Sequence, residues 1–349
     1  MTTSAVIENP RAKRLLSMID VTSGDGLEIG PLFQPLVPRE FPNIRFVDIY
    51  DGDELRSRYK HDPNVREDDI VDPDFVIMTE NGPQTLVEAV GDAGPFDWAV
   101  ASHVAEHVPD LIGWLGEIGE LLVDNGLLLL VVPDCRFTFD ACRPRTTVGQ
   151  MLQAHHDRDQ IPSVRAVFDH FSSVVTVNAA AIWQGTPPDP EAVCSEEEFA
   201  QAQANLSLTG QYVDSHVWLF TPETIVRQLA TLSRLGDMPF VVESVANTEF
   251  CDHEFPVLLR RIPRALSPQE MISARKAGVQ TWTDLDPAEV ARAHGFGLED
   301  DSTPEGSAAA EPLADDSQME VSDKERRLIE RKRSVLLALR RAKGLLRRH

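Results

Sequence analysis

The sequence predicts a doubly wound α/β fold, with a mostly parallel sheet, an antiparallel last strand, an inserted mostly helical subdomain and a C-terminal basic helix. Short apolar runs alternate with helical patterns through the first 135 residues, which is typical of strands joined by crossover helices in a parallel sheet. The alternation resumes near residue 220 and ends in two apolar runs with a short connection, which indicates an antiparallel pair. With 349 residues, 42% of them hydrophobic, the chain can form one large domain with attachments.

The strands of the parallel part are predicted from four apolar runs, at residues 27–30, 45–48, 97–101 and 127–132. Between the last two runs, the sequence PDLIGWLGEIGELLVDNG predicts a helix. The apolar face of this helix consists of Leu111, Leu115, Ile118 and Leu122. Asp110 is suited to cap its start, and Asn125-Gly126 is suited to end it.

Residues 135–217 interrupt the alternation and are too many for a simple connection, so we predict an inserted subdomain on the substrate side. The pattern returns at Thr221, which is suited to cap a helix that starts with Pro222. Two strands are then predicted at residues 240–245 and 255–262. We therefore expect residues 1–263 to form one domain.

The last part of the chain is divided by composition into an acidic linker and a basic helix. Residues 264–320 lose the apolar pattern, and we predict an irregular, disordered linker. Residues 321–349 hold 11 Lys or Arg and 3 Asp or Glu, with leucines along one side of a predicted amphipathic helix. The rest of the chain is strongly acidic, within a net charge of −23, so no nucleic-acid partner is expected.

The basic helix predicts a peripheral contact with an anionic membrane, because each Lys or Arg near such a surface contributes about 1 kcal/mol. A coiled coil with a partner and docking on the acidic body are the alternatives. No run of about 18 apolar residues could span a bilayer, and the N-terminus lacks the apolar core of a signal peptide. The four cysteines show no CxxC or zinc-type spacing. We therefore expect a cytoplasmic protein whose tail contacts the inner face of the membrane.

A cofactor site is predicted where the first two strands end. Gly30 ends the first strand, and Asp48 ends the second, 18 positions later. An acid at the tip of the second strand is suited to bind ribose hydroxyls. No GxGxxG is present to cradle a pyrophosphate, and Pro31, Pro35 and Pro38 prevent a long helix after the first strand. S-adenosylmethionine, which has a ribose but no phosphate, therefore fits this combination better than NAD.

The same segments resemble class I S-adenosylmethionine-dependent methyltransferases. LEIGP at residues 27–31 is similar to the first motif of that family, VDIYD at 47–51 to the second, and residues 96–134 to the later motifs. More narrowly, ASHVAEHVPDLIGWL, VFDHFS and HVWLFTPE resemble bacterial methyltransferase-domain proteins of surface-polysaccharide and glycosyl-transfer pathways. The resemblance spans residues 27–261 and implies a Rossmann-like fold with S-adenosylmethionine as cofactor.

The resemblance also implies which residues bind the cofactor. Those on the methionine and ribose side are Glu28, Gly30 and Asp48. Those on the adenine side are Ile49, Asp74 and Phe75. Ser102 and His103 follow the fourth predicted strand, at the position that touches both cofactor and substrate.

Acceptor chemistry is predicted in three segments after the strand at residues 127–132. Asp134 and Arg136 follow that strand directly and are expected to contact the acceptor. Asp169-His170 and Asp214-x-His216 each place a histidine near a carboxylate. Methyl transfer to a sugar hydroxyl needs alignment of the nucleophile and a base for its proton, which histidine supplies near neutral pH. We predict His170, His216 and Asp169 as the catalytic residues.

No metal ligand is assigned. His103 and His107 form an HxxxH, which on a helix would put both side chains on one face, but the family pattern already explains Glu106-His107 as the start of a helix. The alternative is a magnesium ion held by Asp134, Asp169 and His170, as in some sugar methyltransferases.

The sequence thus predicts an S-adenosylmethionine-dependent methyltransferase that O-methylates a glycan, a glycan precursor or another small-molecule acceptor. The alternative is a non-catalytic protein with the methyltransferase fold that serves as a scaffold in a glycan-assembly complex. The prolines after Gly30 and the basic tail are compatible with that alternative. The missing phosphate loop disfavours an NAD-dependent enzyme. No oligomeric state is predicted.

Overall fold

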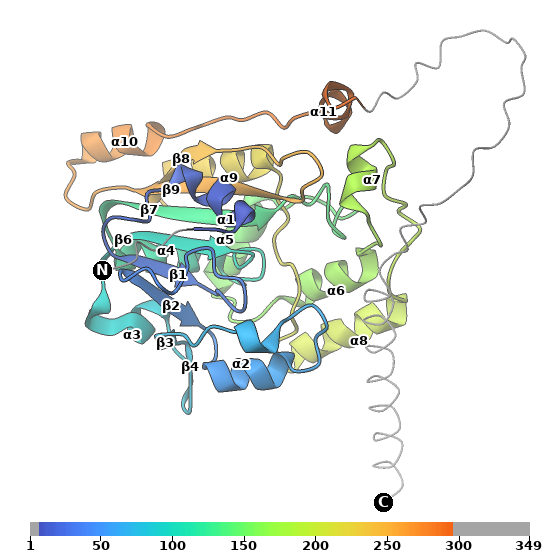
Figure 1. Cartoon of the computed structure of the whole chain (residues 1–349), viewed down its shortest axis with the longest axis horizontal. Helices are drawn as coiled ribbons and strands as arrows, with labels where there is room; N and C mark the ends of the chain where they lie inside the picture. The colour runs from blue at the N-terminus through green and yellow to red at the C-terminus, as the bar shows by residue number, and fades with distance from the viewer. Residues whose placement is uncertain (1–6, 296–349) are drawn as a thin grey trace, which may run out of the picture.

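The computed structural model describes residues 7–295, and its centre is a seven-stranded sheet in the order β3-β2-β1-β6-β7-β9-β8 (Figure 1). The strands are β1 Gly26–Ile29, β2 Ile44–Asp48, β3 Phe75–Val76, β6 Phe96–Ser102, β7 Leu122–Pro133, β8 Phe240–Val245 and β9 Glu254–Arg261. The first five are parallel to one another, whereas β9 is antiparallel to both β7 and β8. This topology confirms the predicted Rossmann-like sheet with an antiparallel last strand.

Apolar layers cover both faces of the sheet, which explains why its strands are continuous apolar runs. Leu27 and Ile29 of β1 face a layer built from α3 (Leu86–Val90), α4 (Leu111–Leu121) and α9 (Pro222–Leu235). Phe46 and Val100, the neighbours of Glu28 on β2 and β6, face a second layer built from α1 (Pro10–Leu15) and residues 36–41. The elements between β2 and β6 include α2 Gly52–Tyr59 and a hairpin of β4 Met78–Thr79 and β5 Gly82–Pro83.

Helix α4 starts as predicted and ends earlier than predicted. The Asp110 side chain accepts a hydrogen bond from the Gly113 amide at 2.9 Å and caps the helix. The helix stops at Leu121, because Leu122 already pairs with Phe96 at the start of β7. The expected terminator, Asn125-Gly126, lies inside β7 at an irregularity in the strand pairing, where Asn125 has a φ of 64°.

The inserted segment is mostly helical, as the sequence indicates. Its helices are α5 Val148–Asp157, α6 Val164–Ser173, α7 Ala179–Trp183 and α8 Glu197–Leu208. Figure 1 shows α6 and α8 beside each other at one end of the sheet. The segment leaves and returns at the carboxyl end of β7, where Asp134 forms a bridge with Phe220. This route places the insertion over the edge of the sheet where ligands bind in open α/β folds.

The region after residue 263 differs from the prediction in its first part. Residues expected to be irregular form α10 (Pro268–Lys276), capped by Ser267, and α11 (Pro287–Ala293), capped by Asp286. Both caps are followed by proline at the first helical position, a signal that the composition argument overlooked. The predicted tail helix at 321–349 and residues 296–320 of the acidic linker lie outside the described residues. Within residues 7–295, no helix is both long and apolar enough to cross a membrane.

Candidate functional site

Gly30 follows β1 in the left-handed region, with a φ of 66°. Its amide donates to the Val47 carbonyl at 2.9 Å, which fixes the turn at the carboxyl end of β1. A Cβ at Gly30 would lie 2.7 Å from Val104 Cγ2 in the loop after β6. The glycine therefore allows the backbone of this turn to be approached closely, as the predicted cofactor position requires.

Asp48 ends β2 beside this turn, and its carboxylate is only partly satisfied. Oδ1 accepts the Ile49 amide at 2.7 Å, whereas Oδ2 is buried and has no hydrogen-bond partner among the described residues. Burial raises the pKa of Asp48 to about 6, against the lowering effect of the Ile49 hydrogen bond and of the Leu32 amide, which approaches the carboxylate without hydrogen-bond geometry. The next side chain, Ile49, is apolar and 45% exposed. A buried oxygen without a donor beside an exposed apolar side chain fits a ribose hydroxyl and an adjoining adenine.

Glu28 points away from this turn, into the layer with residues 36–41. Its two carboxylate oxygens accept the amides of Leu36 at 2.7 Å and Val37 at 2.9 Å. Burial raises its pKa to about 7 despite these two hydrogen bonds. Glu28 thus fastens the proline-containing loop after β1, and its predicted contact with the cofactor stays a prediction.

Asp74 and Phe75 belong to the edge of the sheet at β3. Asp74 precedes the strand, accepts the Phe46 amide at 2.8 Å and pairs with Arg39, so it lies back from the strand tips. Phe75 starts β3 and packs against the core. The segment after β3 comes closer to the ribose acid, because the Ile77 amide donates to the Asp48 carbonyl at 3.0 Å. The adenine contacts of Asp74 and Phe75 remain predictions.

Ser102 and His103 lie at the tip of β6, within a network of charged side chains. His103 Nε2 is 2.8 Å from Glu254 at the start of β9, and Arg11 of α1 donates to both Glu254 and Ser102 Oγ. Burial lowers the pKa of His103, but the contacts with Glu106 and Glu254 raise it by more than burial lowers it. The resulting pKa is about 9. His103 is therefore protonated near neutral pH and cannot serve as a base. Its φ of 55° is strained for a residue with a side chain, which is common at functional sites.

Asp134 and Arg136 lie after β7 as predicted and bind each other. Arg136 donates to the Asp134 carboxylate through Nη2 at 2.7 Å, and Thr248 donates to the same carboxylate at 2.7 Å. Arg136 also donates to the Leu285 carbonyl at 3.0 Å. Asp134 is fully buried, so its contact with an acceptor stays a prediction that would require this set of bonds to open.

The two predicted catalytic histidines come together, but their partners differ from those expected. His216 Nδ1 lies 2.5 Å from Asp140 Oδ2, and the His170 and His216 rings are 5.9 Å apart. Asp169, the neighbour of His170 in sequence, pairs with Arg165 on the exposed side of α6 at 3.1 Å. Burial and the charge of Arg143 lower the pKa of His170 to about 3, which makes it a weak base. Only His216 therefore has the supporting carboxylate that a catalytic histidine requires.

Glu106 and His107 lie in the loop between β6 and α4, rather than in a helix as expected. His107 Nδ1 is 2.9 Å from Asp214, the carboxylate that the sequence suggested for His216. The rings of His107 and His216 are 4.8 Å apart and perpendicular. Glu106 is fully buried next to them. The structure therefore forms a cluster of Glu106, His107 and His216, the Glu-His-His cluster, from residues that the sequence treated separately.

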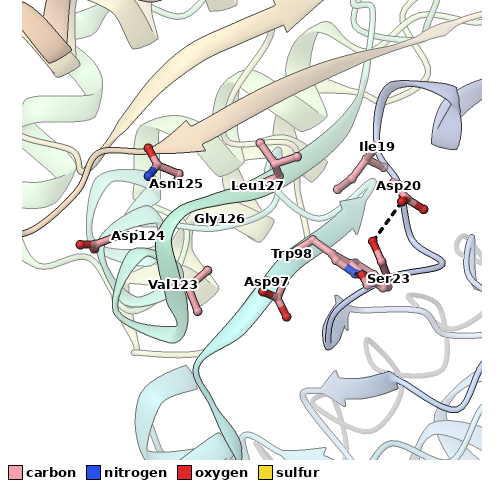
Figure 2. Close-up of a pocket in the computed structure, with 10 residues that line it drawn as sticks. All are labelled: Ile19, Asp20, Ser23, Asp97, Trp98, Val123, Asp124, Asn125, Gly126 and Leu127. Carbon is pink, nitrogen blue, oxygen red and sulfur yellow. Dashed lines mark hydrogen bonds between the residues drawn. The ribbon is translucent and has the colours of Figure 1, made fainter.

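Tyr59 on α2 senses charged groups from the cofactor side and from the neighbourhood of the Glu-His-His cluster. Burial and the charges of Asp214 and Asp48 raise the pKa of Tyr59 on α2, so this side chain responds to carboxylates from both places. An open hollow at the opposite, amino-terminal edge of the sheet is lined by residues such as Asp97, Asn125 and Ser23 (Figure 2). It contains none of the strand-tip residues, so we assign the functional site to the carboxyl edge.

A sequence profile of the methyltransferase domain family matches residues 5–231. The chain belongs to this family. Family membership makes S-adenosylmethionine the cofactor, in agreement with the carboxyl-edge geometry of Gly30 and Asp48. A comparison with curated proteins finds no match.

The solved structures with similarity to this methyltransferase-domain protein include the following three. A putative hemolysin from Streptococcus thermophilus has 11% identity and a TM-score of 0.35, over 84% of this chain and 79% of that one. An S-adenosylmethionine-dependent methyltransferase from Mesorhizobium loti has 13% identity and a TM-score of 0.34, over 74% and 99%. Mitomycin 7-O-methyltransferase MmcR has 13% identity and a TM-score of 0.32, over 72% of this chain and 52% of that one. The chain thus spans about half the length of MmcR.

Sequence reasoning missed three residues of the site: Arg11, Asp140 and Glu254. Glu254 could have been found, because an antiparallel last strand begins at the edge where the parallel strands end. Asp140 and Arg11 reach the site through loop and helix geometry that carries no short-range signal.

Proposed function

We propose that this protein is an S-adenosylmethionine-dependent methyltransferase that transfers a methyl group to a hydroxyl of a glycan or glycan precursor. The observation that carries the cofactor part is Asp48, whose buried Oδ2 has no hydrogen-bond partner among the described residues. Ribose hydroxyls would donate to this oxygen, and the turn at Gly30 would admit the ribose and methionine. The cofactor supplies an electrophilic methyl group on its sulfonium.

The acceptor side is proposed at His216. In the transfer, the hydroxyl oxygen bonds to the methyl carbon as the carbon–sulfur bond breaks, and the hydroxyl proton must leave. Asp140 holds Nδ1 of His216 and so orients the ring, which lies beside Glu106 and His107. An imidazole placed in this way can accept the proton, or can bind a metal ion that activates the hydroxyl.

The glycan as acceptor is supported by the sequence resemblance to methyltransferase-domain proteins of surface-polysaccharide pathways. Lipid-linked glycans are made at the inner face of the membrane, where the basic tail would hold the enzyme. A scaffold without activity is the second candidate. It is favoured because the carboxylate of Glu28, a predicted cofactor contact, is already engaged by the amides of Leu36 and Val37.

The test is transfer of an isotopically labelled methyl group from S-adenosylmethionine to nucleotide sugars, lipid-linked sugars and purified surface polysaccharide. We expect label in one glycan class, lost about 100-fold or more in His216→Gln while S-adenosylhomocysteine still binds. Label in a non-glycan small molecule would show that the acceptor belongs to another chemical class. Cofactor binding without transfer to any acceptor would support the scaffold.

A further inference from the structure

The Glu-His-His cluster joins two segments that lie far apart in sequence. The amides of Val217 and Trp218 donate to the Glu106 carbonyl at 2.7 and 3.2 Å, which fixes residues 213–220 against the loop after β6. One carboxylate oxygen and two imidazole nitrogens of the cluster lie within 4.8 Å of one another. Nitrogen and oxygen ligands about 2.0–2.1 Å from a tetrahedral zinc are about 3.3 Å apart, so small side-chain rotations would close the cluster around one ion.

Glu106 lacks the hydrogen bonds that a buried carboxylate normally has. Its side chain is 0% exposed, and neither carboxylate oxygen has a hydrogen bond within the part of the chain that the structure describes. The protonated His103 ring forms an ion pair with Glu106, with Nδ1 3.3 Å from Oε1, and its Nε2 is held by Glu254. The His103 cation offsets part of the cost of burying this carboxylate, and the oxygens without hydrogen bonds keep lone pairs for a second cation.

The two histidines have the outer partners that metal-binding histidines have. Asp214 lies 2.9 Å from His107 Nδ1, and Asp140 lies 2.5 Å from His216 Nδ1. Each carboxylate accepts the Nδ1 proton, which leaves Nε2 with its lone pair for a metal. His107 Nε2 is 4.0 Å from Glu106 Oε1, so this nitrogen is on the side of the cluster.

We propose that Glu106, His107 and His216 bind one divalent transition-metal ion, of which Zn²⁺ fits best. Two imidazoles and one carboxylate form a three-ligand set that keeps a coordination position open, and imidazole favours zinc over magnesium. His107 is 30% exposed, so the cluster is accessible to solvent. A hydroxyl acceptor bound there would be activated by the ion, with His216 as ligand rather than base; this role rests on the proposed function, whereas the metal site does not.

The magnesium alternative raised by the sequence gains no support from the geometry. Asp134 is bound to Arg136 and Thr248, and Asp169 faces Arg165 at the surface of α6. His170 Nδ1 is instead 3.3 Å from the His216 amide. These groups have other partners and do not meet at one point.

The test measures metal binding by the full chain, without cofactor or acceptor. The protein is stripped with EDTA, dialysed, and titrated with Zn²⁺ in competition with a chromophoric chelator. We expect one tightly bound equivalent of Zn²⁺ and much weaker binding of Mg²⁺. With Co²⁺, visible d–d absorption should appear without a thiolate charge-transfer band. Absence of a stoichiometric equivalent, or a thiolate band from the cysteines, would overturn the site.

Variants locate the ion. Glu106→Gln and His216→Gln should each lower Zn²⁺ affinity by at least about 100-fold, and Asp140→Asn by about 10- to 100-fold through His216. The matched control is His155→Gln, because His155 also pairs with a carboxylate, Asp110, but lies on the surface. Its affinity should equal that of the unaltered protein.

Melting temperature and S-adenosylhomocysteine affinity check that each variant folds. Unchanged affinity in a folded Glu106 or His216 variant, or lost affinity in the His155 control, would contradict the proposal. If the Glu106 and His216 variants do not fold, Asp140→Asn and the Co²⁺ spectrum of the unaltered protein decide. Since no methyl transfer is measured, failure of the metal site is distinct from failure of the proposed function.

Discussion

His216 Nδ1 lies 2.5 Å from Asp140 Oδ2, although the two residues are 76 positions apart in the chain. Asp140 also pairs with Arg143, and the three side chains are almost completely buried. Burial raises the pKa of Asp140, but the contacts with His216 and Arg143 lower it by more than burial raises it. The resulting pKa is about 2. The carboxylate is therefore charged at any ordinary pH, and it fixes both the ring orientation and the position of Arg143.

This relationship predicts a large stability effect for Asp140→Asn. The substitution leaves Arg143 buried without a counter-charge, which should lower the free energy of unfolding by about 3 kcal/mol. The control is Asp169→Asn, which removes an exposed pair with Arg165 and should cost less than about 1 kcal/mol. Urea unfolding at neutral pH measures both. Equal effects of the two substitutions would contradict the structural role of Asp140.

Gly30→Ala and Gly116→Ala form a second pair of test and control substitutions. Gly30→Ala places a side chain in a left-handed turn and against Val104, so we expect a loss of about 1–2 kcal/mol or more and weaker cofactor binding. Gly116→Ala lies in α4 with open space around the new Cβ and should stabilise the protein by up to about 1 kcal/mol. Thermal unfolding separates the two. A neutral Gly30→Ala would show that the turn is not constrained.

The sheet could be predicted because its signals are local. Each parallel strand is a short apolar run, and the helix starts at Asp110 and Thr221 have side-chain caps that the structure reproduces. The end of α4 could not be placed, because pairing of Leu122 with Phe96 overrides the turn signal of Asn125-Gly126. The helices after residue 263 were missed because composition outweighed the Ser267-Pro268 start signal.

The site was only partly predictable, for a related reason. Gly30 and Asp48 follow from the rule that ligands bind where parallel strands end. The histidine partners do not, because proximity in sequence suggested Asp214 for His216, whereas the fold gives Asp214 to His107 and Asp140 to His216. Pairings across an inserted segment depend on how that segment returns to the sheet, and no local pattern encodes this.

The pKa of Asp48 predicts how cofactor affinity depends on pH. Ribose hydroxyls donate best to a charged carboxylate, so S-adenosylhomocysteine affinity should fall as the pH drops below about 6. The stability of the unliganded protein should change in the opposite direction. Because the pKa of Asp48 in the folded protein is above the unfolded value of 3.8, Asp48 makes a contribution to folding stability that is present below pH 3.8. This contribution is lost as the pH rises through about 6.

Asp48→Asn provides the control for this pH dependence. Calorimetric titrations across this range should show a decline in affinity for the unaltered protein and a flatter profile for Asp48→Asn. Parallel profiles would mean that another group governs the titration.

The most direct test of the central claim is calorimetric titration of S-adenosylhomocysteine into the unaltered protein, Asp48→Ala and Asp53→Ala. Asp53 serves as control because it is fully exposed in the first turn of α2, close in sequence and equal in charge. The account predicts micromolar binding, about −8 kcal/mol, weakened by about 1.5–3 kcal/mol in Asp48→Ala and unchanged in Asp53→Ala, with no binding of NAD. Equal affinity of a folded Asp48→Ala and the unaltered protein, or binding of NAD alone, would contradict it.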